Sequence, residues 1–303
     1  MTRTRKTGGF AAVWREHKEK YILMAPFIIL FSIFTFIPVV VSLVLSFTDF
    51  NMFEVPNFVG LANYINLIAF DDVFLIAVRN TLVLALITGP VSYLLCFVFA
   101  WIINELPTKL RAVMTLVFFA PNLSGATFLL WGLFFSSDMH GFFNAYALNW
   151  GFISEPILWF ENEAFIMPIL ILVTLWMSIG VSFLAFIGGL QTVDKSLYES
   201  GAVDGVSNRW QELWFITLPA MKPMLMFGAV MQITASLSVG AVSIALMGFP
   251  TVNYAGHTIV THLHDFGSIR YEMGYASAIA TLLFFMMLFS NIIVQKLLRK
   301  MNG

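Results

Sequence analysis

Charged residues are scarce in this chain of 303 residues: 16 are Lys or Arg, 17 are Asp or Glu, and together they make up 11%. Hydrophobic residues make up 59%, and the mean hydropathy is +0.85. This composition excludes a soluble globular domain, because such domains carry about 25% charged residues. The net charge of -1 gives no reason to expect a nucleic-acid partner. The sequence therefore predicts a protein embedded in a lipid bilayer.

Cysteine is nearly absent as well. Cys96 is the single cysteine, which excludes an internal disulfide and a cysteine-based metal cluster, and we expect it to act as a small apolar residue in a helix. The chain also lacks the GxxxxGK[ST] pattern of a phosphate-binding loop. We therefore expect no cofactor in this chain, and any ATP-driven work would need a second polypeptide.

Apolar runs dominate what is present. Each has roughly the 20 residues that cross about 30 Å of hydrocarbon, and none contains Asp, Glu, Lys, Arg or His between its ends. We expect kinks at Pro38 and at Gly89-Pro90. The predicted fold is an all-α membrane protein with six transmembrane helices, over residues 21–47, 81–104, 113–135, 167–190, 224–249 and 273–295.

Lysine and arginine set the expected orientation, because cytoplasmic loops are enriched in them. A cytoplasmic N-terminus leaves only Arg79 and Arg270 outside. The tail 1–20, both termini and the segment 191–223 are then cytoplasmic. The residues predicted inside are Arg3, Arg5, Lys6, Arg15, Lys18, Lys20, Lys109, Arg111, Lys195, Arg209, Lys222, Lys296, Arg299 and Lys300.

The segment 191–223 is the one long polar stretch between two apolar blocks near the end of the chain. Its pattern predicts two short helices joined by a turn. Asp194 or Thr192 can cap a first helix that runs through Asp204, and Gly205 stands where a left-handed C-terminal cap would fall. Asn208 with Gln211 resembles a capping box for a second helix, which we expect Pro219 to end.

The same segment resembles a family motif. Glu199-Ser-Gly, Asp204-Gly205 and Ile216-Thr-Leu-Pro219 are similar to the EAA loop, EAA...G...I.LP, of permease subunits in ATP-binding-cassette (ABC) importers. The stretches APFIILFSIFTFIPVVVSLVLSFTDF, FVGLANY and MGYASAIATLLFF resemble carbohydrate permeases of the maltose-transporter inner-membrane type. Two departures are Ser200 and Gly201 in place of alanines, and ten residues instead of nine between Gly205 and Ile216.

The resemblance implies a type I importer permease in a bacterial plasma (inner) membrane, which forms half of a sugar pathway. The implied partners are a homologous second permease, a cytoplasmic ATPase dimer that binds ATP and Mg, an extracytoplasmic sugar-binding protein, the sugar and the bilayer. In this reading the loop docks on the ATPase, and Glu199 makes a polar contact there. Apolar anchors would be Leu197, Tyr198, Trp210, Leu213 and Trp214. The residues expected to couple to the ATPase are Leu197, Glu199, Ser200, Gly201, Asp204, Gly205, Trp210, Leu213, Ile216, Leu218 and Pro219.

Two other interpretations of these features remain open. The loop could instead be an amphipathic segment lying at the lipid headgroups with its tryptophans as anchors. The whole chain could be a self-sufficient carrier or facilitator, which would be expected to show repeats or buried charges, or a membrane enzyme, which would need a His/Asp/Glu cluster at one face.

Neutral polar and aromatic side chains near the middle of the spans are candidates for sugar contacts. They could equally hold helices together, as small polar residues do in membranes. Gln232 is the preferred candidate, because a buried amide without a partner is costly. The set is Tyr93, Asn122, Ser124, Trp131, Trp176, Ser178, Gln232 and Ser236.

Two outer loops carry further features. His262-Leu-His264-Asp265 lacks a third and fourth metal ligand at a recognisable spacing, so we expect surface histidines there. The acidic segment 136–166 could meet a binding protein, or form an outer lid packed on its own aromatic residues.

Overall fold

The computed structural model describes residues 10–124 and 127–301, and in this part of the chain the regular secondary structure is helical, with one isolated bridge between Thr48 and Phe58. The helices are α1 (Phe10–Phe31), α2 (Ile37–Leu45), α3 (Ala62–Ala69), α4 (Asp72–Asn104), α5 (Thr108–Leu123), α6 (Leu129–Phe134), α7 (Phe142–Asn149), α8 (Glu163–Met177), α9 (Val181–Thr192), α10 (Lys195–Val203), α11 (Arg209–Glu212), α12 (Leu218–Ala220), α13 (Lys222–Leu237), α14 (Ala241–Met247), α15 (Ile259–His264) and α16 (Met273–Met301). π-helical turns occupy Ser32–Phe36, Leu213–Thr217 and Asp265–Ile269, and a 3-10 turn occupies Val252–Tyr254.

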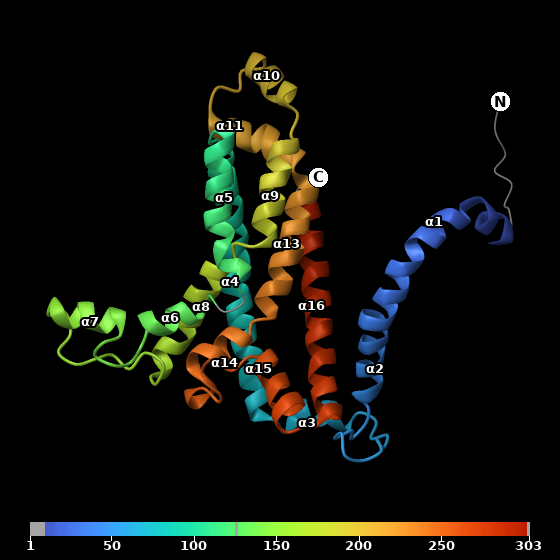
Figure 1. The fold of residues 1–303 in the computed structure, drawn as a ribbon, viewed down its shortest axis with the longest axis vertical. Helices are drawn as coiled ribbons and strands as arrows, with labels where there is room; N and C mark the ends of the chain where they lie inside the picture. Colours follow the sequence, from blue (N-terminus) through green and yellow to red (C-terminus); the bar gives the residue numbers. More distant parts are fainter. Residues whose placement is uncertain (1–9, 125–126, 302–303) are drawn as a thin grey trace.

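The core of the bundle lies where α4, α9 and α13 pack together (Figure 1). Phe183 and Phe186 of α9 are fully buried there, with Cys96 and Ala100 of α4. Gly228 of α13 lies directly against the Phe186 ring, where any added Cβ would clash. Close approach at a small residue is the usual way to gain helix contact in a bilayer, where lipid tails are as apolar as the side chains.

The N-terminal arm of α1 and α2 lies beside the bundle and meets it through α2, which packs on α16. The π turn Ser32–Phe36 separates the two helices and ends just before Pro38, which sits in the first turn of α2. Proline cannot donate to the preceding turn, and a π turn is a common way to adjust the ladder at such a point. The irregularity expected at Pro38 is therefore present, whereas α4 continues as one helix through Pro90.

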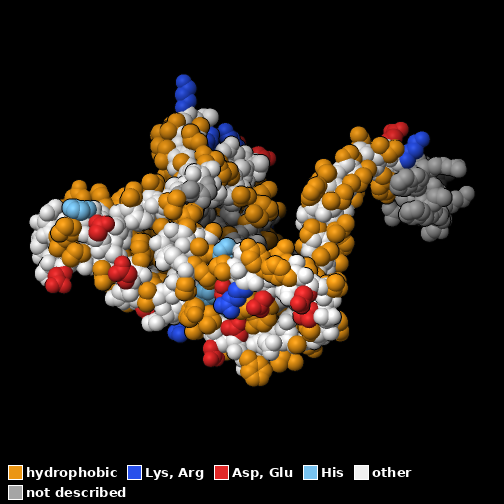
Figure 2. Space-filling view, turned by 60° about the horizontal axis from the view of Figure 1, so that its bottom comes forward, with side chains coloured by type: hydrophobic (Ala, Val, Ile, Leu, Met, Phe, Trp, Pro, Cys, Tyr) orange, Lys and Arg blue, Asp and Glu red, His pale blue; other side chains and the backbone are white. Residues whose placement is uncertain are grey.

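The two ends of the bundle carry different elements. The short helices α10 and α11 and the end of α16 lie at one end, and α3, α14 and α15 lie at the other (Figure 1). Acidic side chains are spread over the end with α3 and α15, while apolar side chains cover the length of the N-terminal arm (Figure 2). The apolar flanks and polar ends fit a bundle that crosses a bilayer.

Four described helices are long and apolar enough to cross a membrane, His17–Leu45, Asp72–Asn104, Glu163–Thr192 and Met273–Leu298, and a bent pair, Arg209–Ala220 with Lys222–Leu237, makes up to five. The helix of the second span begins at Asp72 instead of residue 81, and the helix of the first already includes much of the tail 1–20. Residues 1–9, with Arg3, Arg5 and Lys6, lie outside the described part of the chain.

Besides the fourth span, in which α8 ends at Met177 and α9 begins at Val181, two of the expected spans are not continuous helices. In the run 113–135, α5 ends at Leu123 and α6 begins at Leu129, with residues 125–126 outside the described part. In the run 224–249, α13 ends at Leu237, and α14 starts after Gly240. Gly240 packs against Val260 so closely that a Cβ would collide with that side chain, so the α15 segment approaches the backbone where the helix breaks.

Candidate functional site: a capped helical loop and a broken span

The first helix of the polar segment, α10, is capped by Asp194. Its carboxylate accepts a hydrogen bond of 2.9 Å from the Ser196 amide, and this bond lowers the pKa of Asp194. The alternative cap, Thr192, instead donates its hydroxyl to the Gly189 carbonyl at 2.8 Å within α9. Asp194 is therefore the residue that starts the helix.

The turn after α10 is a Schellman motif built on Gly205. The Val206 amide donates to the Gly201 carbonyl at 2.9 Å, and the Gly205 amide donates to the Ala202 carbonyl at 3.3 Å. Gly205 has φ +95°, in the region that glycine adopts without strain. The left-handed cap predicted at this residue is confirmed.

The cap of α11 differs from the predicted capping box by one residue. The Asn208 side chain accepts from the Gln211 amide at 2.9 Å, as expected. The Gln211 side chain, however, accepts from the Ser207 amide at 2.8 Å instead of the Asn208 amide. The Gln211 side chain thus bonds the residue before the N-cap, and the backbone amides of both Ser207 and Gln211 have a hydrogen-bond partner at the start of α11.

Pro219 does not end the second helix, contrary to expectation. The π turn Leu213–Thr217 precedes it, Pro219 lies in the first turn of α12, and the chain bends by 80° only where α13 begins at Lys222. A π turn accommodates one more residue than an α turn. It therefore provides a place for the extra residue between Gly205 and Ile216.

The surface of the loop is both charged and apolar. Glu199, Ser200 and Asp204 are exposed on α10 and its cap. Leu213 is 6% exposed and belongs to the core, so the prediction of Leu213 as a surface anchor is wrong. Gly201 is buried, and a Cβ there would lie 2.6 Å from the tip of Ile216, which explains a small residue at that position. The exposed apolar side chains, here called the apolar face of the loop, are Leu197, Val203, Trp210, Trp214 and Phe215.

Val203 and Phe215 were missed by the sequence reasoning, although both are large apolar residues within the polar segment. Tyr198, predicted as an anchor, is half-buried, and its hydroxyl bonds the Thr217 hydroxyl at 2.9 Å. It therefore ties α10 to the π turn instead of offering its ring to a partner.

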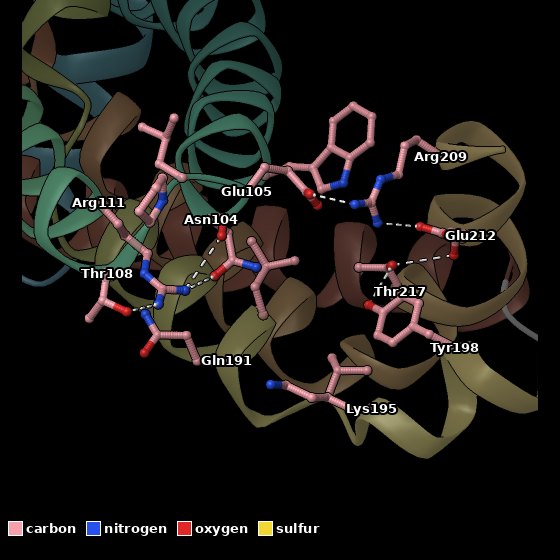
Figure 3. A pocket seen from close by; sticks show the side chains of 15 residues that line it. Asn104, Glu105, Thr108, Arg111, Gln191, Lys195, Tyr198, Arg209, Glu212 and Thr217 are labelled. Atoms are coloured by element: carbon pink, nitrogen blue, oxygen red, sulfur yellow. Dashed lines mark hydrogen bonds and ion pairs between the residues drawn. The ribbon is translucent and has the colours of Figure 1, made fainter.

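The loop is tied to the end of α4 by a charged cluster and an aromatic pair. The Arg209 guanidinium lies 2.9 Å from the Glu105 carboxylate and 2.7 Å from the Glu212 carboxylate (Figure 3). Trp210 packs on Trp101 with ring centroids 5.3 Å apart. The Glu212 hydrogen bond and the Glu105 charge raise the pKa of Arg209. These contacts join α11 directly to the end of α4.

We expect Glu105→Gln to weaken this link without unfolding the protein. An exposed ion pair contributes only about 0–1 kcal/mol to stability. In the importer that the sequence leads us to expect, the ratio of solute transported to ATP hydrolysed should nevertheless fall, by at most about fivefold, since a pair of up to about 1 kcal/mol changes an equilibrium by that factor. Arg209→Gln should act the same way, and the double variant should be no worse than either single one.

The matched control for this cycle is Glu54→Gln, which removes an exposed carboxylate from the loop between α2 and α3. It should leave the ratio unchanged. Additive losses in the Glu105→Gln/Arg209→Gln double variant would show that the two side chains act independently.

The fourth span is broken between α8 and α9, at Ser178–Gly180, deep in the bundle. The freed carbonyls are satisfied by side chains from other helices. Asn122 of α5 donates to the Met177 carbonyl at 3.0 Å, and Gln232 of α13 donates to the Ser178 carbonyl at 3.2 Å. Cys96 of α4 also donates to the Ser178 carbonyl, at 3.5 Å. Broken backbone at membrane depth is tolerated where it is buried and satisfied in this way.

The candidate sugar contacts form three groups instead of one site. Asn122, Ser178 and Gln232 meet at the break. Gln232, Ser236 and Tyr93 line an apolar cavity of about 380 Å³ between α4, α13 and α16. Trp131 and Trp176 pack edge to face at 5.6 Å, and Ser124 lies exposed at the end of α5. Gln232 is 4% exposed with its amide group engaged, so its contacts fit the role of holding helices together.

Of the two histidines expected at the surface, His264 is exposed, whereas His262 is buried together with His257. His257 and His262 are each 2% exposed. Their rings are joined at 3.1 Å, His262 Nε2 lies 3.0 Å from the Asp71 carboxylate, and the Tyr275 hydroxyl donates to Asp71 at 2.9 Å. Asp71 also caps α4 through the Phe74 amide. The cluster fastens α4, α15 and α16 together, and among the described residues no group of three or more His, Cys, Asp or Glu could hold a metal.

We expect this cluster to make the free energy of unfolding decrease as the pH falls. Burial lowers the pKa of His262 and lowers that of His257 to about 4. Histidine in the unfolded chain has a pKa near 6.5, so it takes up a proton at a higher pH than the buried residues do. The free energy of unfolding is therefore highest above about pH 6.5 and decreases as the pH falls toward 4. The decrease between pH 7 and pH 5 is roughly 1–2 kcal/mol. Thermal unfolding followed from pH 7.5 to 5 checks this. A His257→Gln variant should lose most of the dependence, and an unchanged slope in that variant would contradict the assignment.

The acidic outer segment packs on its own aromatic residues. Phe135 contacts Phe143 at 4.9 Å and Trp159 at 5.4 Å between ring centroids. Asn144 is fully buried at its centre, where it accepts from the Ile157 amide and the Trp159 indole and donates to three carbonyls. The sequence reasoning missed Asn144, since nothing in its local pattern distinguishes it from other loop asparagines. The lid-like packing is observed, and docking of a binding protein on it stays a prediction.

Comparison with known proteins identifies the class. The chain is 30% identical over 275 residues to the probable ABC transporter permease protein YesP of Bacillus subtilis (strain 168), covering 89% of this chain and 86% of that one. It is 30% identical over 297 residues to the arabinooligosaccharides transport system permease protein AraP of the same organism, covering 96% and 93%. It is 29% identical to the lactose transport system permease protein LacF of Rhizobium radiobacter, over 72% of each chain. No family model matches.

Solved structures agree on the fold. A chain of the bacterial alginate ABC transporter, crystallised in complex with an alginate pentasaccharide-bound periplasmic protein, superposes with a TM-score of 0.75 at 24% identity over 96% of this chain and 98% of that one. A second crystal structure of an alginate-importing ABC transporter gives a TM-score of 0.71 at 26% identity, over 94% and 99%.

The fold and the relatives together place the chain in the family of ABC transporter permease proteins. It is a multi-pass protein of the inner membrane and a translocation subunit, not an enzyme.

Proposed function

We propose that this chain is one of two permease subunits of an ATP-driven importer of sugars or oligosaccharides, and that the loop from Asp194 to Pro219 docks on a cytoplasmic ATPase. The observation that carries the proposal is the construction of the loop. α10 and α11 are short, individually capped and joined at Gly205, and they present Glu199 together with the apolar face. Exposed aromatic anchors surrounded by a polar rim are typical of a protein interface.

The relatives support the nature of the cargo. Their names concern arabinooligosaccharides and lactose, and the structural neighbours transport alginate delivered by a periplasmic protein. The spans of this chain carry hydroxyl, amide and aromatic groups near their middles, which are the partners that a sugar uses. We therefore propose a carbohydrate, an extracytoplasmic binding protein and ATP with Mg bound on the separate ATPase.

The proposed crossing count is six, with both termini cytoplasmic. It treats α5–α6 and α13–α14 as broken spans, in the same way that α8–α9 is broken. The end that carries α10, α11 and the last turn of α16 also carries most of the lysines and arginines, and acidic residues predominate at the other end.

Thiol labelling tests this orientation. In a Cys96→Ala background, a cysteine at Asn208 should react with an impermeant maleimide only from the cytoplasmic side, and one at Asn149 only from outside, since both positions are exposed. Reaction from the opposite sides would invert the topology and place the loop away from any cytoplasmic ATPase.

The proposed function is tested by assembly and hydrolysis. The chain should co-purify with a second permease and an ATPase, and the purified complex should hydrolyse ATP faster when a sugar-loaded binding protein is added. A chain that purifies alone, and transports sugar down a gradient in vesicles, would instead favour the self-sufficient facilitator.

A further inference from the structure

A polar cavity of about 520 Å³ lies beneath the coupling loop, between the α4–α5 link and the start of α10 (Figure 3). Its two ends differ in charge. At one end Arg209 is balanced by Glu105 and Glu212. Arg111 lies at the other end and Lys195 lies between the two ends (Figure 3), and within the described part of the chain neither pairs with a carboxylate. This second end therefore carries an uncompensated positive charge.

Arg111 is held in place by neutral groups. Its guanidinium donates to the Asn104 side-chain oxygen at 2.9 Å, to the Asn104 carbonyl at 3.4 Å and to the Thr108 hydroxyl at 3.5 Å. These acceptors orient the guanidinium without neutralising it. Because guanidinium presents five donors and pairs well with phosphate, the remaining donors suit a phosphate oxyanion.

An apolar groove of about 480 Å³ begins where the polar cavity ends. Thr108, Arg111 and Gln191 line both spaces. From there the groove follows α5 and α9 into the apolar part of the bundle, between Leu116, Phe119 and Ile187. Leu116 is 61% exposed, so the groove is open along the side of the bundle. The cavity and the groove thus form one continuous space, which is polar and positively charged at one end and apolar at the other.

We propose that this space binds an anionic phospholipid of the cytoplasmic leaflet, with its phosphate against Arg111 and Lys195 and one acyl chain in the groove between α5 and α9. Basic pockets between helices at the cytoplasmic face recognise anionic headgroups, and burial of an acyl chain adds affinity with each CH₂. The groove and the charge together select a lipid over a soluble phosphate, because a soluble phosphate has nothing to place in the groove.

Bound there, the lipid lies between α5, α9 and the first turn of α10, beside the Arg209–Glu105 link. Its presence would therefore depend on the composition of the membrane and would affect the loop that we propose meets the ATPase. This consequence rests on the proposed function, whereas lipid binding itself rests only on the site and the proposed orientation.

Native mass spectrometry of the full-length chain, alone and co-purified with its partner subunits, tests the proposal. Phosphatidylglycerol should be retained at least about tenfold better than phosphatidylcholine with the same acyl chains. Arg111→Gln/Lys195→Gln should abolish that preference, since it removes both unpaired charges. The matched control Lys109→Gln/Lys300→Gln removes the same charge from exposed positions outside both spaces and should keep the preference.

The groove is tested separately with Ala112→Trp, which places a large ring inside it. This variant should bind phosphatidylglycerol several-fold more weakly, while inorganic phosphate and glycerol phosphate should compete poorly with the lipid on the wild-type chain. An equal preference in the Arg111→Gln/Lys195→Gln variant would overturn the proposal, as would glycerol phosphate binding as tightly as the lipid. Retention by the lone chain but not by the complex would assign the groove to a partner subunit and overturn it too. ATP hydrolysis measured on the same samples reports the proposed function independently of lipid binding.

Discussion

Replacement of Gly205 by valine is expected to abolish coupling between ATP hydrolysis and sugar in the assembled transporter. Gly205 has φ +95°, and a β-branched residue held there is strained by about 1–3 kcal/mol. The Schellman bonds of Val206 and Gly205 that set the angle between α10 and α11 would be given up to relieve this strain. Sugar-stimulated hydrolysis should fall at least about tenfold, while the amount of protein in the membrane should be unchanged.

Gly151 offers a matched control for this variant. It also has a positive φ, of +70°, and like Gly205 it has no other atom within 4 Å of an added Cβ, but it lies in the outer segment after α7. Gly151→Val therefore imposes similar strain at the opposite end of the molecule. Hydrolysis should remain sugar-stimulated in Gly151→Val, and an equal loss in both variants would mean that general destabilisation is responsible.

Reversal of the charge at Glu199 is expected to weaken association with the ATPase. Glu199 is the central residue of α10, the fifth of nine. A carboxylate there gains nothing from the helix dipole, which acts within the first and last turns, so the stability of α10 does not explain its presence. A hydrogen bond to a charged group contributes about 1.5–3 kcal/mol, so Glu199→Lys should weaken association by roughly tenfold or more.

Co-purification of the ATPase with the variant, followed by a binding titration, checks the expected loss. Glu199→Gln keeps the shape of the side chain and should lose part of the affinity. Glu161→Lys reverses an exposed charge in the outer segment and should lose none. Full affinity in Glu199→Lys would remove Glu199 from the interface.

Sequence reasoning found the features that are determined by residues close together in the chain. Asp194, Gly205 and Asn208 were predicted as caps because the groups that they satisfy lie within a few residues. The apolar blocks were found for the same reason, since the length needed to cross a bilayer is a local property.

The parts that were missed depend on contacts between distant segments. The break at Ser178–Gly180 is tolerated because Gln232 and Asn122, from other helices, satisfy its carbonyls. His262 is buried because it meets Asp71, 191 positions earlier in the chain. The motif pattern treated Pro219 as a stop, but the π turn before it carries the helix past the proline. No local pattern contains these partners.

Which apolar residues of the loop are buried could not be predicted from the local sequence either. Leu213 and Trp214 are adjacent and equally apolar in sequence, yet Leu213 is 6% exposed and Trp214 is 69% exposed. Leu213 packs in the core among residues of α4 and α9, and Trp214 does not. Contacts between distant segments therefore decide which apolar residues of the loop stay exposed.

We propose that this chain moves sugar only when ATP is hydrolysed on another subunit. Vesicles containing the complete complex, loaded with ATP and supplied with sugar-bearing binding protein, measure it most directly through the uptake of radiolabelled oligosaccharide. Uptake should require ATP inside the vesicles and should vanish when this chain is reconstituted alone. Uptake by the lone chain, driven by a sugar or proton gradient without ATP, would contradict it.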